Sequence, residues 1–374
     1  CEEVQLLILV PSRELAIQIE QVVRQMGTGF KVNAVYGGRA GSKDRMEIKH
    51  RPAVLVGTPG RVADHLRREA FDTAFIQCLV LDEFDKSLEI GFEGEMRDIL
   101  HALPDVGRKI LTSATQGVEI PRFVGLKSPQ VLDFLEDKIS QLQVKKVVSP
   151  TKDKLETLGQ LLGQLGSKNG IIFCNFKDSI QRVSDYLSDH DISHGVFSGG
   201  MEQIDRERSL IKFRNGTYPL LLATDLAARG IDVPELDFII HYHLPLRAEE
   251  FIHRNGRTAR MNSEGTAYIL QYEKEPLPDF VGKPALEKLL PSTLPAPSPW
   301  STLLISGGRK DKISKGDIAG LFLKQGGINA AELGAIELKV DCAFVAVKSA
   351  VLEQVLPKVN NQKLKEKKVR ITVI

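Results

Sequence analysis

Short apolar runs alternate with longer amphipathic segments along most of the chain. The runs "LLILV" at 6–10 and "AVLVG" at 53–57 are each followed by a segment whose apolar residues recur with helical spacing, the first of which opens near Ser12. The pattern restarts at Lys152, and "GIIFCNF" at 170–176 is the clearest apolar run of this second part. Apolar strands separated by amphipathic helices indicate parallel sheets that helices cover on both faces. We therefore expect two successive α/β domains of similar size.

The pattern changes at two places. Residues 136–150 are polar and are expected to form a connector that leads into a strand. Seven prolines lie between Glu273 and Trp300, and because proline stiffens the chain, this segment is expected to be a semi-rigid linker with one short helix at "ALEKLL". Beyond it, the periodicity predicts the order β-α-β-β-α-β, the split βαβ arrangement that RNA recognition motifs share.

Composition restricts the class of protein. The 374 residues are 42% hydrophobic and 26% charged, which is ordinary for a soluble chain with two or three cores. No apolar run approaches the roughly 20 residues that span a bilayer, and no secretory leader is recognisable. The four cysteines lie far apart, so we expect reduced thiols rather than disulfides or a zinc site. The chain opens at Cys1, almost directly in a strand-like run, which we interpret as a truncated front end.

Charge is distributed unevenly. From Trp300 onward there are 13 Lys and Arg against 7 Asp and Glu, whereas the rest of the chain carries a small negative excess. A basic tail domain on a mildly acidic body indicates a polyanionic partner for the tail. A solvated lysine-rich face would give the same count, so charge alone leaves both interpretations open.

Three carboxylates stand at the tip of a predicted strand in "LVLDEFDKS", residues 79–87. Parallel sheets bind their ligands in the crevice at the carboxyl ends of the strands. Asp82 and Glu83 there would suit a hydrated Mg²⁺ ion and a base that activates water, which is the chemistry of phosphate-ester hydrolysis. Acidic pairs in loops are mostly structural, so this interpretation needs support from other segments.

Two other segments give that support. "HRNGRTAR" at 253–260 places three arginines at spacings of three around Gly256, and guanidinium groups suit bidentate contact with phosphate oxygens. "ATDLAARGIDVP" at 223–234 follows another apolar run and carries Asp225 and Asp232 on either side of a glycine. A basic helix edge would also be compatible with plain solvation.

Several segments of residues 1–272 resemble the motifs of the DEAD-box RNA helicases of superfamily 2, and they occur in the same order as in that family. Phe84 replaces the Ala of the family, Asn255 replaces Ile, and Ala259 replaces Gly. The matching segments are "PSRELA" at 11–16, Gly37-Gly38, "TPGR" at 58–61, "DEFD" at 82–85, "SAT" at 113–115, "IIFCN" at 171–175, Gln203 with Arg206, and the two segments of the preceding paragraph.

The resemblance implies the fold and its division. It implies an α/β protein with two RecA-like parallel domains, the first of them incomplete, and a C-terminal α+β domain of the RNA recognition motif type. "ISGGRKDKISKGDIAG" near the C-terminus is most similar to the RNA-binding domain of DbpA-like helicases. The expected parts are the ATP-binding helicase domain at 1–138, the C-terminal helicase domain at 139–275, a Pro-rich linker at 276–300 and the RNA-binding domain at 301–374.

Roles at the nucleotide follow from the resemblance. Asp82 would hold Mg²⁺ through water, and Glu83 would orient or deprotonate the attacking water. The other residues implied on this side are Ser113 and Thr115, which would tie the acids to the interdomain cleft, Asp232 at the ribose of ATP, and Arg257 and Arg260 as arginine fingers at the γ-phosphate.

RNA contacts are implied in all three domains. Phosphate and sugar contacts bind RNA of any sequence, which separates positioning from specificity. The implied residues of the helicase core are Arg13, Gly38, Thr58, Arg61, Gly199, Arg206 and Thr224. In the C-terminal domain, where Phe344 is the one aromatic residue of the third strand, the candidates are Arg309, Lys310 and Lys312, with Lys315, Lys348 and 363–368 beside them.

One expected motif is missing from the sequence. No G-x-x-x-x-G-K-[ST] loop is present, the loop whose backbone amides and lysine cradle the phosphates of a nucleotide. The upstream glutamine motif of the family is missing as well. We therefore expect a helicase from the complete gene, but poor ATP hydrolysis by this chain alone.

These features predict an ATP-dependent RNA helicase that uses ATP and Mg²⁺ and remodels structured RNA, specifically 23S-type ribosomal RNA during large-subunit assembly. We further expect a monomeric, cytoplasmic bacterial protein without membrane contact, with pre-ribosomal particles as partners. One alternative is a non-catalytic relative that serves as an RNA scaffold or chaperone, and another is a DNA helicase or translocase. The presence of Asp82, Glu83, Arg257 and Arg260 argues against the scaffold. The residues of "PSRELA", "DEFD" and "HRNGRTAR" match the RNA helicases and argue against the DNA helicase.

Overall fold

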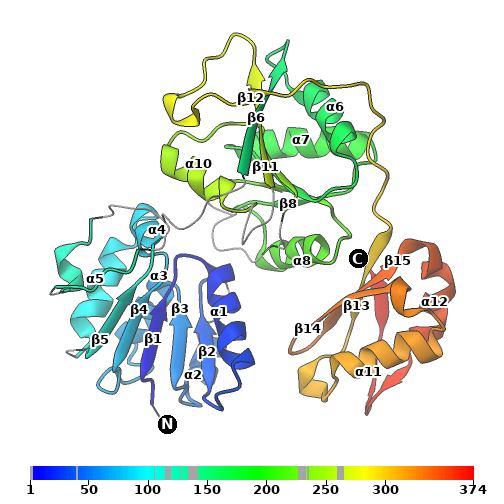
Figure 1. The fold of residues 1–374 in the computed structure, drawn as a ribbon. Coiled ribbons are helices and arrows are strands. Elements are labelled where there is room, and N and C mark those ends of the chain that lie inside the picture. The colour runs from blue at the N-terminus through cyan, green and yellow to red at the C-terminus, as the bar shows by residue number, and fades with distance from the viewer. Residues whose placement is uncertain are drawn as a thin grey trace. The chain divides into compact units, whose positions relative to one another are not determined.

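The computed structural model describes residues 3–38, 41–104, 106–113, 119–126, 128–133, 142–225, 233, 236–258 and 265–374. They fall into two compact units, one formed by the described residues up to 133 and one by those from 142 onward. The first unit is named lobe 1. The second contains lobe 2, residues 142–286, and the C-terminal module, residues 300–374 (Figure 1).

Lobe 1 is built on a five-stranded parallel sheet with the strand order β2-β3-β1-β4-β5, which can be followed across the blue and cyan part of Figure 1. The strands are β1 (Leu6–Leu9), β2 (Val32–Val35), β3 (Val54–Gly57), β4 (Cys78–Leu81) and β5 (Arg108–Leu111). The helices are α1 (Arg13–Gln25), α2 (Gly41–Ile48), α3 (Pro59–Arg67), α4 (Phe84–Glu89) and α5 (Glu93–Ala102).

Both faces of this sheet are covered, as the uninterrupted apolar strands predict. Leu7 points into one core cluster, together with Val62 of α3 and Met96 of α5. Its neighbour Ile8 points into the other cluster, together with Leu15 of α1. The side chain of Ser12 accepts a hydrogen bond from the Leu15 amide at 3.2 Å and so caps α1 at the predicted position.

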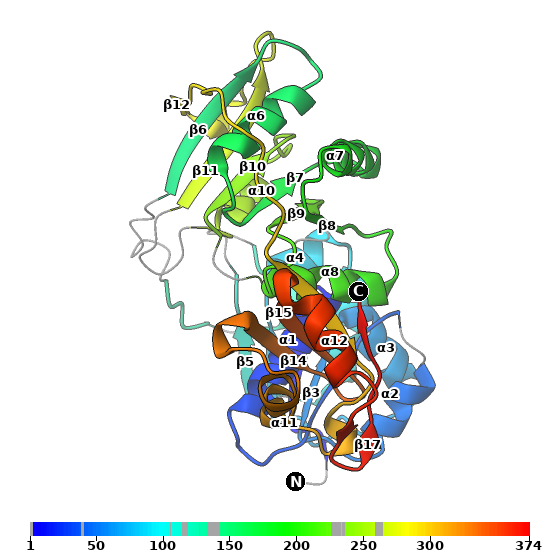
Figure 2. The ribbon, with the colours of Figure 1, turned by 90° about the vertical axis from the view of Figure 1, so that its right-hand side faces the viewer.

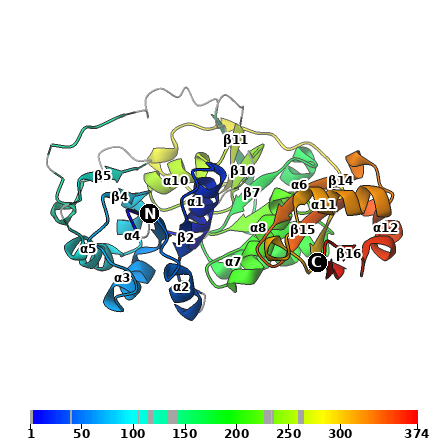
Figure 3. The same cartoon turned by 90° about the horizontal axis from the view of Figure 1, so that it is seen from below.

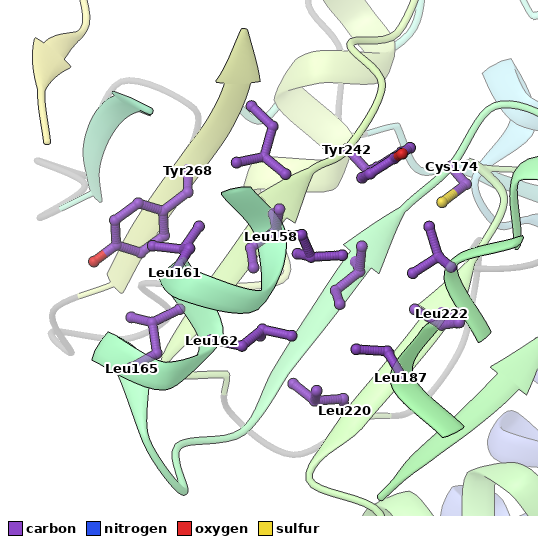
Figure 4. Packing of buried hydrophobic residues seen from close by; sticks show 14 of the residues in the cluster. Leu158, Leu161, Leu162, Leu165, Cys174, Leu187, Leu220, Leu222, Tyr242 and Tyr268 are labelled. Atoms are coloured by element: carbon purple, nitrogen blue, oxygen red, sulfur yellow. The ribbon is translucent and has the colours of Figure 1, made fainter. Parts of the chain in front are cut away.

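Lobe 2 carries a seven-stranded sheet in the order β12-β6-β11-β10-β7-β9-β8, and all of its neighbouring strands run parallel. The strands are β6 (Leu142–Ser149), β7 (Gly170–Phe173), β8 (His194–Phe197), β9 (Leu220–Ala223), β10 (Phe238–His241), β11 (Gly265–Tyr272) and β12 (Ala285–Leu286). The helices are α6 (Leu155–Leu165), α7 (Lys177–Asp189), α8 (Gln203–Arg214) and α10 (Ala248–Asn255). Leucines of α6 and α7 pack on β7 and β9 in one apolar cluster, which Figure 4 shows from close by.

The segment "ALEKLL" corrects a prediction. Instead of a helix, Ala285 and Leu286 form β12, a two-residue edge strand that pairs with β6, and the two lie side by side in Figure 2. Glu287 fixes this pairing through an ion pair with Lys145 at 2.8 Å and a hydrogen bond from Gln164 at 2.8 Å. Prolines on both sides leave fewer than two helical turns, which is too short for a stable isolated helix.

The C-terminal module has the predicted β-α-β-β-α-β order. Its antiparallel sheet has the strand order β14-β15-β13-β18, and α11 and α12 cover one face of it. The elements are β13 (Trp300–Ile305), α11 (Lys315–Gly320) with a following turn of π-helix (Leu321–Gln325), β14 (Leu333–Leu338), β15 (Ala343–Lys348), α12 (Leu352–Val359) and β18 (Ile371–Val373). An additional hairpin, β16 (Lys363–Leu364) with β17 (Lys367–Lys368), lies within the basic 363–368 run.

Cys78, Cys174 and Cys342 are free thiols, and Cys1 lies outside the described residues. Within the described ranges, none of the helices is long and apolar enough to cross a membrane.

Candidate functional site

The acids of lobe 1 stand at the carboxyl end of β4, where the neighbouring strand β5 ends as well. The Thr112 hydroxyl, directly after β5, donates a hydrogen bond to the Asp82 carboxylate and accepts one from the Glu83 amide at 3.1 Å. The Thr112 carbonyl accepts from the Phe84 amide at 3.1 Å. Thr112 therefore fixes the carboxylate of one acid and the backbone of the other.

Glu83 has a left-handed backbone, with φ 46° and ψ 49°. This conformation costs a residue with a side chain on the order of 1–2 kcal/mol and is uncommon away from turns and functional sites. Here it ends β4 and starts α4. The turn leaves Asp82 and Glu83 half-exposed at the sheet edge and directs Phe84 inward.

Phe84, which replaces the Ala of the family, points away from the exposed edge that carries the acids. It is 4% exposed and packs in the core of lobe 1 with Leu81 and Met96. The third carboxylate of the motif, Asp85, is buried as well, with Lys86 Nζ at 3.9 Å from its Oδ2. Two of the three carboxylates thus remain for chemistry, and the third belongs to the protein interior.

Thr112 was not predicted from the sequence, where the resemblance implied only that Ser113 and Thr115 tie the acids to the interdomain cleft. Ser113 is half-buried and follows Thr112 directly, and Thr115 lies outside the described residues. The available signal was topological: β5 is the neighbour of β4, so the first hydroxyl after β5 reaches the acids that follow β4.

We expect Thr112→Val to lower the rate of ATP hydrolysis by about 10- to 100-fold, the usual effect of removing a residue that orients a catalytic group. The assay uses an ATPase-competent form of the protein, in which the missing G-x-x-x-x-G-K-[ST] loop is supplied. The substitution keeps the volume but removes both hydroxyl hydrogen bonds. Thr112→Ser keeps the hydroxyl and is expected to retain most of the rate. Equal rates for the Val and Ser variants in steady-state assays would contradict the orienting role.

The predicted RNA-contact residues of lobe 1 gather at the other half of the same sheet edge, where β1, β3 and β2 end side by side. The Arg13 guanidinium lies against Gly38, so closely that a Cβ at this glycine would collide with it, and the φ of +88° at Gly38 also favours glycine. Arg61 donates to the buried Asp44 at 2.7 Å, and Thr58 is the N-cap residue of the helix that carries Arg61.

In lobe 2, Arg254 is not available for phosphate, although it shares the spacing of the other two arginines of its motif. It is 2% exposed, and its guanidinium forms an ion pair with Asp225. It also donates to the Asn175 side chain at 2.8 Å and to the His243 carbonyl at 2.6 Å. Arg254 therefore ties the end of α10 to the strand ends around it.

His241 and Asn255 extend this buried network. Burial, with Arg254 nearby, lowers the pKa of His241 to about 3, so the imidazole is neutral near pH 7. Nε2 lies 3.0 Å from the Asn255 side-chain oxygen, and Nδ1 lies 3.4 Å from Arg254 Nη1. Because Arg254 is always a donor, Nδ1 is the acceptor and Nε2 carries the proton that Asn255 accepts. The departure of Asn255 from the family pattern thus has a partner in His241.

We expect Asn255→Ile to destabilise the chain by about 1–3 kcal/mol, because the buried Nε2–H of His241 loses its acceptor. The double variant His241→Leu/Asn255→Ile replaces both polar partners by apolar side chains and is expected to recover most of that loss. Chemical denaturation of the two variants and the parent measures the difference. Additive losses in the double variant would show that the two residues act independently.

Arg257 lies two residues after Asn255 of this network, and the residue that follows it, Thr258, is anchored as well. Thr258 is buried, and its hydroxyl donates to the Leu236 carbonyl at 2.5 Å. Arg257 itself is half-exposed between these two anchors. Two of the predicted nucleotide contacts, Asp232 and Arg260, lie outside the described residues.

The predicted RNA-contact residues of lobe 2 lie at the adjacent β9 and β8 end of the sheet. Thr224 follows β9, and Gly199 is exposed beyond β8. Arg206 on α8 is 9% exposed, with its guanidinium 4.7 Å from the centre of the Phe197 ring. In the C-terminal module, Arg309, Lys310 and Lys312 are exposed on one short loop, whereas Lys348 lies 4.1 Å from the centre of the Trp300 ring.

Three family profiles match the chain. The DEAD/DEAH box helicase profile matches residues 1–123, the helicase conserved C-terminal domain matches 153–262, and the DbpA RNA binding domain matches 302–373.

Known proteins are similar over most of this length. The chain is 30% identical over 386 residues to the ATP-dependent RNA helicase DbpA of Escherichia coli (strain K12), covering 100% of this chain and 84% of the relative. The Bacillus subtilis (strain 168) protein of the same name is 29% identical over 403 residues, covering 98% and 84%. The structure of S. cerevisiae Dbp5 bound to RNA and ADP BeF3 has a TM-score of 0.64 at 26% identity, over 73% of this chain and 72% of that chain.

The chain therefore belongs to the DEAD/DEAH box helicases, a family of enzymes with helicase and ATPase activity. The two parallel α/β sheets are its RecA-like domains. Within the family it is DbpA-like, because its C-terminal module matches the DbpA RNA binding domain and the similarity to two DbpA proteins extends over nearly the whole chain.

Proposed function

We propose that this chain acts as an ATP-dependent RNA helicase that locally unwinds or remodels structured RNA, with ribosomal RNA of the large subunit as its target. The observation that carries the proposal is that each lobe holds charged groups in place beside its strand ends. The acids at the end of β4 are held in place by Thr112, and Arg257 stands on a loop anchored at both ends. Neither arrangement is needed for RNA binding alone.

The acidic tip fits a magnesium ion. Mg²⁺ prefers oxygen ligands and commonly takes only one or two carboxylates, since phosphates and water complete its shell. Asp82 would hold the ion, which would neutralise charge on the nucleotide phosphates. Glu83, on its left-handed turn, would orient or deprotonate the attacking water. Arg257 and Arg260 would stabilise charge at the γ-phosphate, and Asp232 would bind the ribose.

RNA would follow the opposite half of each sheet edge. In lobe 1 this half carries Arg13, Gly38, Thr58 and Arg61, and in lobe 2 it carries Gly199, Arg206 and Thr224. Contacts to phosphate and 2′-OH would hold RNA of any sequence. The C-terminal module, whose loop exposes Arg309, Lys310 and Lys312, would select a structured site and raise the effective concentration of nearby duplex.

We expect removal of residues 300–374 to weaken binding to a structured large-subunit rRNA fragment by about 10²-fold, because the second binding event is lost. Binding to unstructured RNA is expected to change little. Titration of both RNAs with the truncated and the parent chain measures the difference. Equal losses for the two RNAs would contradict the selecting role of the module.

Hydrolysis by the 374-residue chain alone is expected to be poor, because the sequence contains no G-x-x-x-x-G-K-[ST] loop. The ATPase-competent form used in the tests is a form of the protein in which such a loop is supplied. RNA-stimulated hydrolysis by that form supports the helicase. Tight RNA binding without stimulation would support the RNA scaffold instead, and stimulation by DNA would support a DNA translocase.

We further propose that the protein is a cytoplasmic bacterial monomer that acts on pre-ribosomal particles.

A further inference from the structure

Charged side chains join α8 of lobe 2 to β14 of the C-terminal module and to Lys339, which follows β14. Figure 3 shows the ribbon of α8 next to the module. Arg214 donates to both carboxylate oxygens of Glu337, at 2.7 and 2.8 Å. Lys339 bridges two acids, with Nζ at 2.7 Å from Glu337 and at 2.7 Å from Glu207 of α8. Positive and negative charges therefore alternate across the contact. Burial raises the pKa of Glu337, but Arg214 and Lys339 outweigh burial, so the pKa is lowered and the carboxylate stays charged.

A second set of contacts joins the loop after α8 to β13. Thr302 is completely buried, and its hydroxyl lies 2.9 Å from the Asn215 side-chain nitrogen and 2.7 Å from the Thr217 hydroxyl. The Ser298 hydroxyl donates to the Gly216 carbonyl at 2.7 Å. The polar groups on both sides of this contact thus find their partners across it.

Alternation along the strands shows which face of the module is used. Leu303 and Val345 point into the core of the module, beneath α11 and α12. Thr302 and Ala346 face the other way, yet both are 0% exposed. Asn215 and Thr217 of lobe 2 contact Thr302 on this face, and in RNA recognition motifs it is this open face that stacks bases.

We propose that the C-terminal module uses the open face of its sheet to dock on the end of α8 and its following loop, so that the module and lobe 2 move as one body. The occupant of this face is the protein's own second lobe, fixed in orientation by the Arg214–Glu337 pair and by Thr302. Paired charges set orientation more strongly than apolar contact does, because a shift leaves them unpaired in a partly dehydrated contact.

Docking on α8 has a mechanical consequence. This helix begins at Gln203 and carries Arg206, so the segment that holds the module also carries a proposed RNA contact. RNA held by the module would keep a constant orientation to the RNA path of lobe 2. Only this consequence rests on the proposed function, because docking itself needs neither ATP nor RNA.

Trp300, the one tryptophan of the chain, reports on docking directly. It begins β13, and a Cβ at Gly216 of lobe 2 would lie 3.4 Å from its indole ring. Arg214→Glu changes a charge in lobe 2 only, so it leaves the sequence of the module untouched. We expect this variant to shift the tryptophan emission to longer wavelength. We also expect proteolysis within 287–299, the segment before the module, to accelerate at least about tenfold.

Matched variants separate docking from general damage. Arg182→Glu makes the same charge change on the exposed face of α7 and is expected to leave emission and proteolysis unchanged. The exchange Arg214→Glu/Glu337→Arg restores an attractive pair and is expected to recover the parent emission. Emission and cleavage that stay at parent values in Arg214→Glu would overturn the proposal, as would an exchange variant no closer to the parent than Arg214→Glu.

Discussion

Glu83→Gln is expected to lower RNA-stimulated ATP hydrolysis by about 10²- to 10⁴-fold in the ATPase-competent form, the range that a general base contributes. The glutamine side chain has nearly the same shape as the glutamate side chain. The left-handed turn and the hydrogen bond from the backbone N–H of residue 83 to Thr112 are therefore retained. The substitution removes the ability of the side chain to accept a proton from water. Steady-state hydrolysis at saturating ATP and RNA measures the change.

A matched control is available on α5 of the same lobe. Glu93 is exposed and paired with Arg97 at 2.6 Å, so Glu93→Gln is expected to hydrolyse ATP at the parent rate. RNA affinity is expected to stay the same in both variants, because Glu83 lies on the half of the sheet edge that we propose binds the nucleotide. A Glu83→Gln enzyme that turns over as fast as Glu93→Gln would refute the role assigned to this acid.

Arg257→Ala is expected to lower turnover by about 10³- to 10⁵-fold, the range measured for arginines that stabilise charge on a transferring phosphoryl group. Because that charge develops in the transition state, turnover should fall much more than the affinity for ATP. Arg257→Lys is expected to recover little, since an ammonium group lacks the planar fork of a guanidinium. Arg260→Ala is expected to behave like Arg257→Ala.

Arg247 offers the control for this loss. It is exposed at the N-cap of α10, at the opposite end of the helix that leads to Arg257. Arg247→Ala removes the same type of side chain at the other end of α10, and its rate is expected to match the parent. Equal turnover for Arg247→Ala and Arg257→Ala would show that the loop after α10 does not act on the nucleotide.

The order of elements was predictable because it depends on local periodicity. Apolar runs bounded by polar loops place the strands within a few residues, and Ser12 caps its helix where the sequence places it. The "ALEKLL" segment was predicted wrongly because its composition is helical, while its structure is decided by the free edge of β6. That edge is a tertiary feature, and local composition carries no information about it.

The candidate site was predictable to the level of motifs but not of individual contacts. Arg254 and Arg257 look equivalent in the sequence, and only the positions of Asp225 and the strand ends bury the first of them. The contact between Thr112 and the acids can be predicted only if β5 is known to lie next to β4. The sequence shows only that Asn255 replaces the Ile of the family, and its hydrogen-bond partner His241, fourteen residues earlier, is visible only in the structure. Each of these contacts joins segments that are distant along the chain, where a single sequence gives no pairing signal.

The central claim is that a nucleotide and RNA together bring the acids of lobe 1 and the arginines of lobe 2 onto one triphosphate. Spin labels at the exposed positions Asp98 on α5 and Asp185 on α7 would report the distance between the lobes in the ATPase-competent form. We predict that a single narrow distance distribution appears only when RNA and ADP–beryllium fluoride are both present, and that Arg257→Ala abolishes it. A distribution that ignores the two ligands, or that narrows equally in Arg257→Ala, would contradict the account.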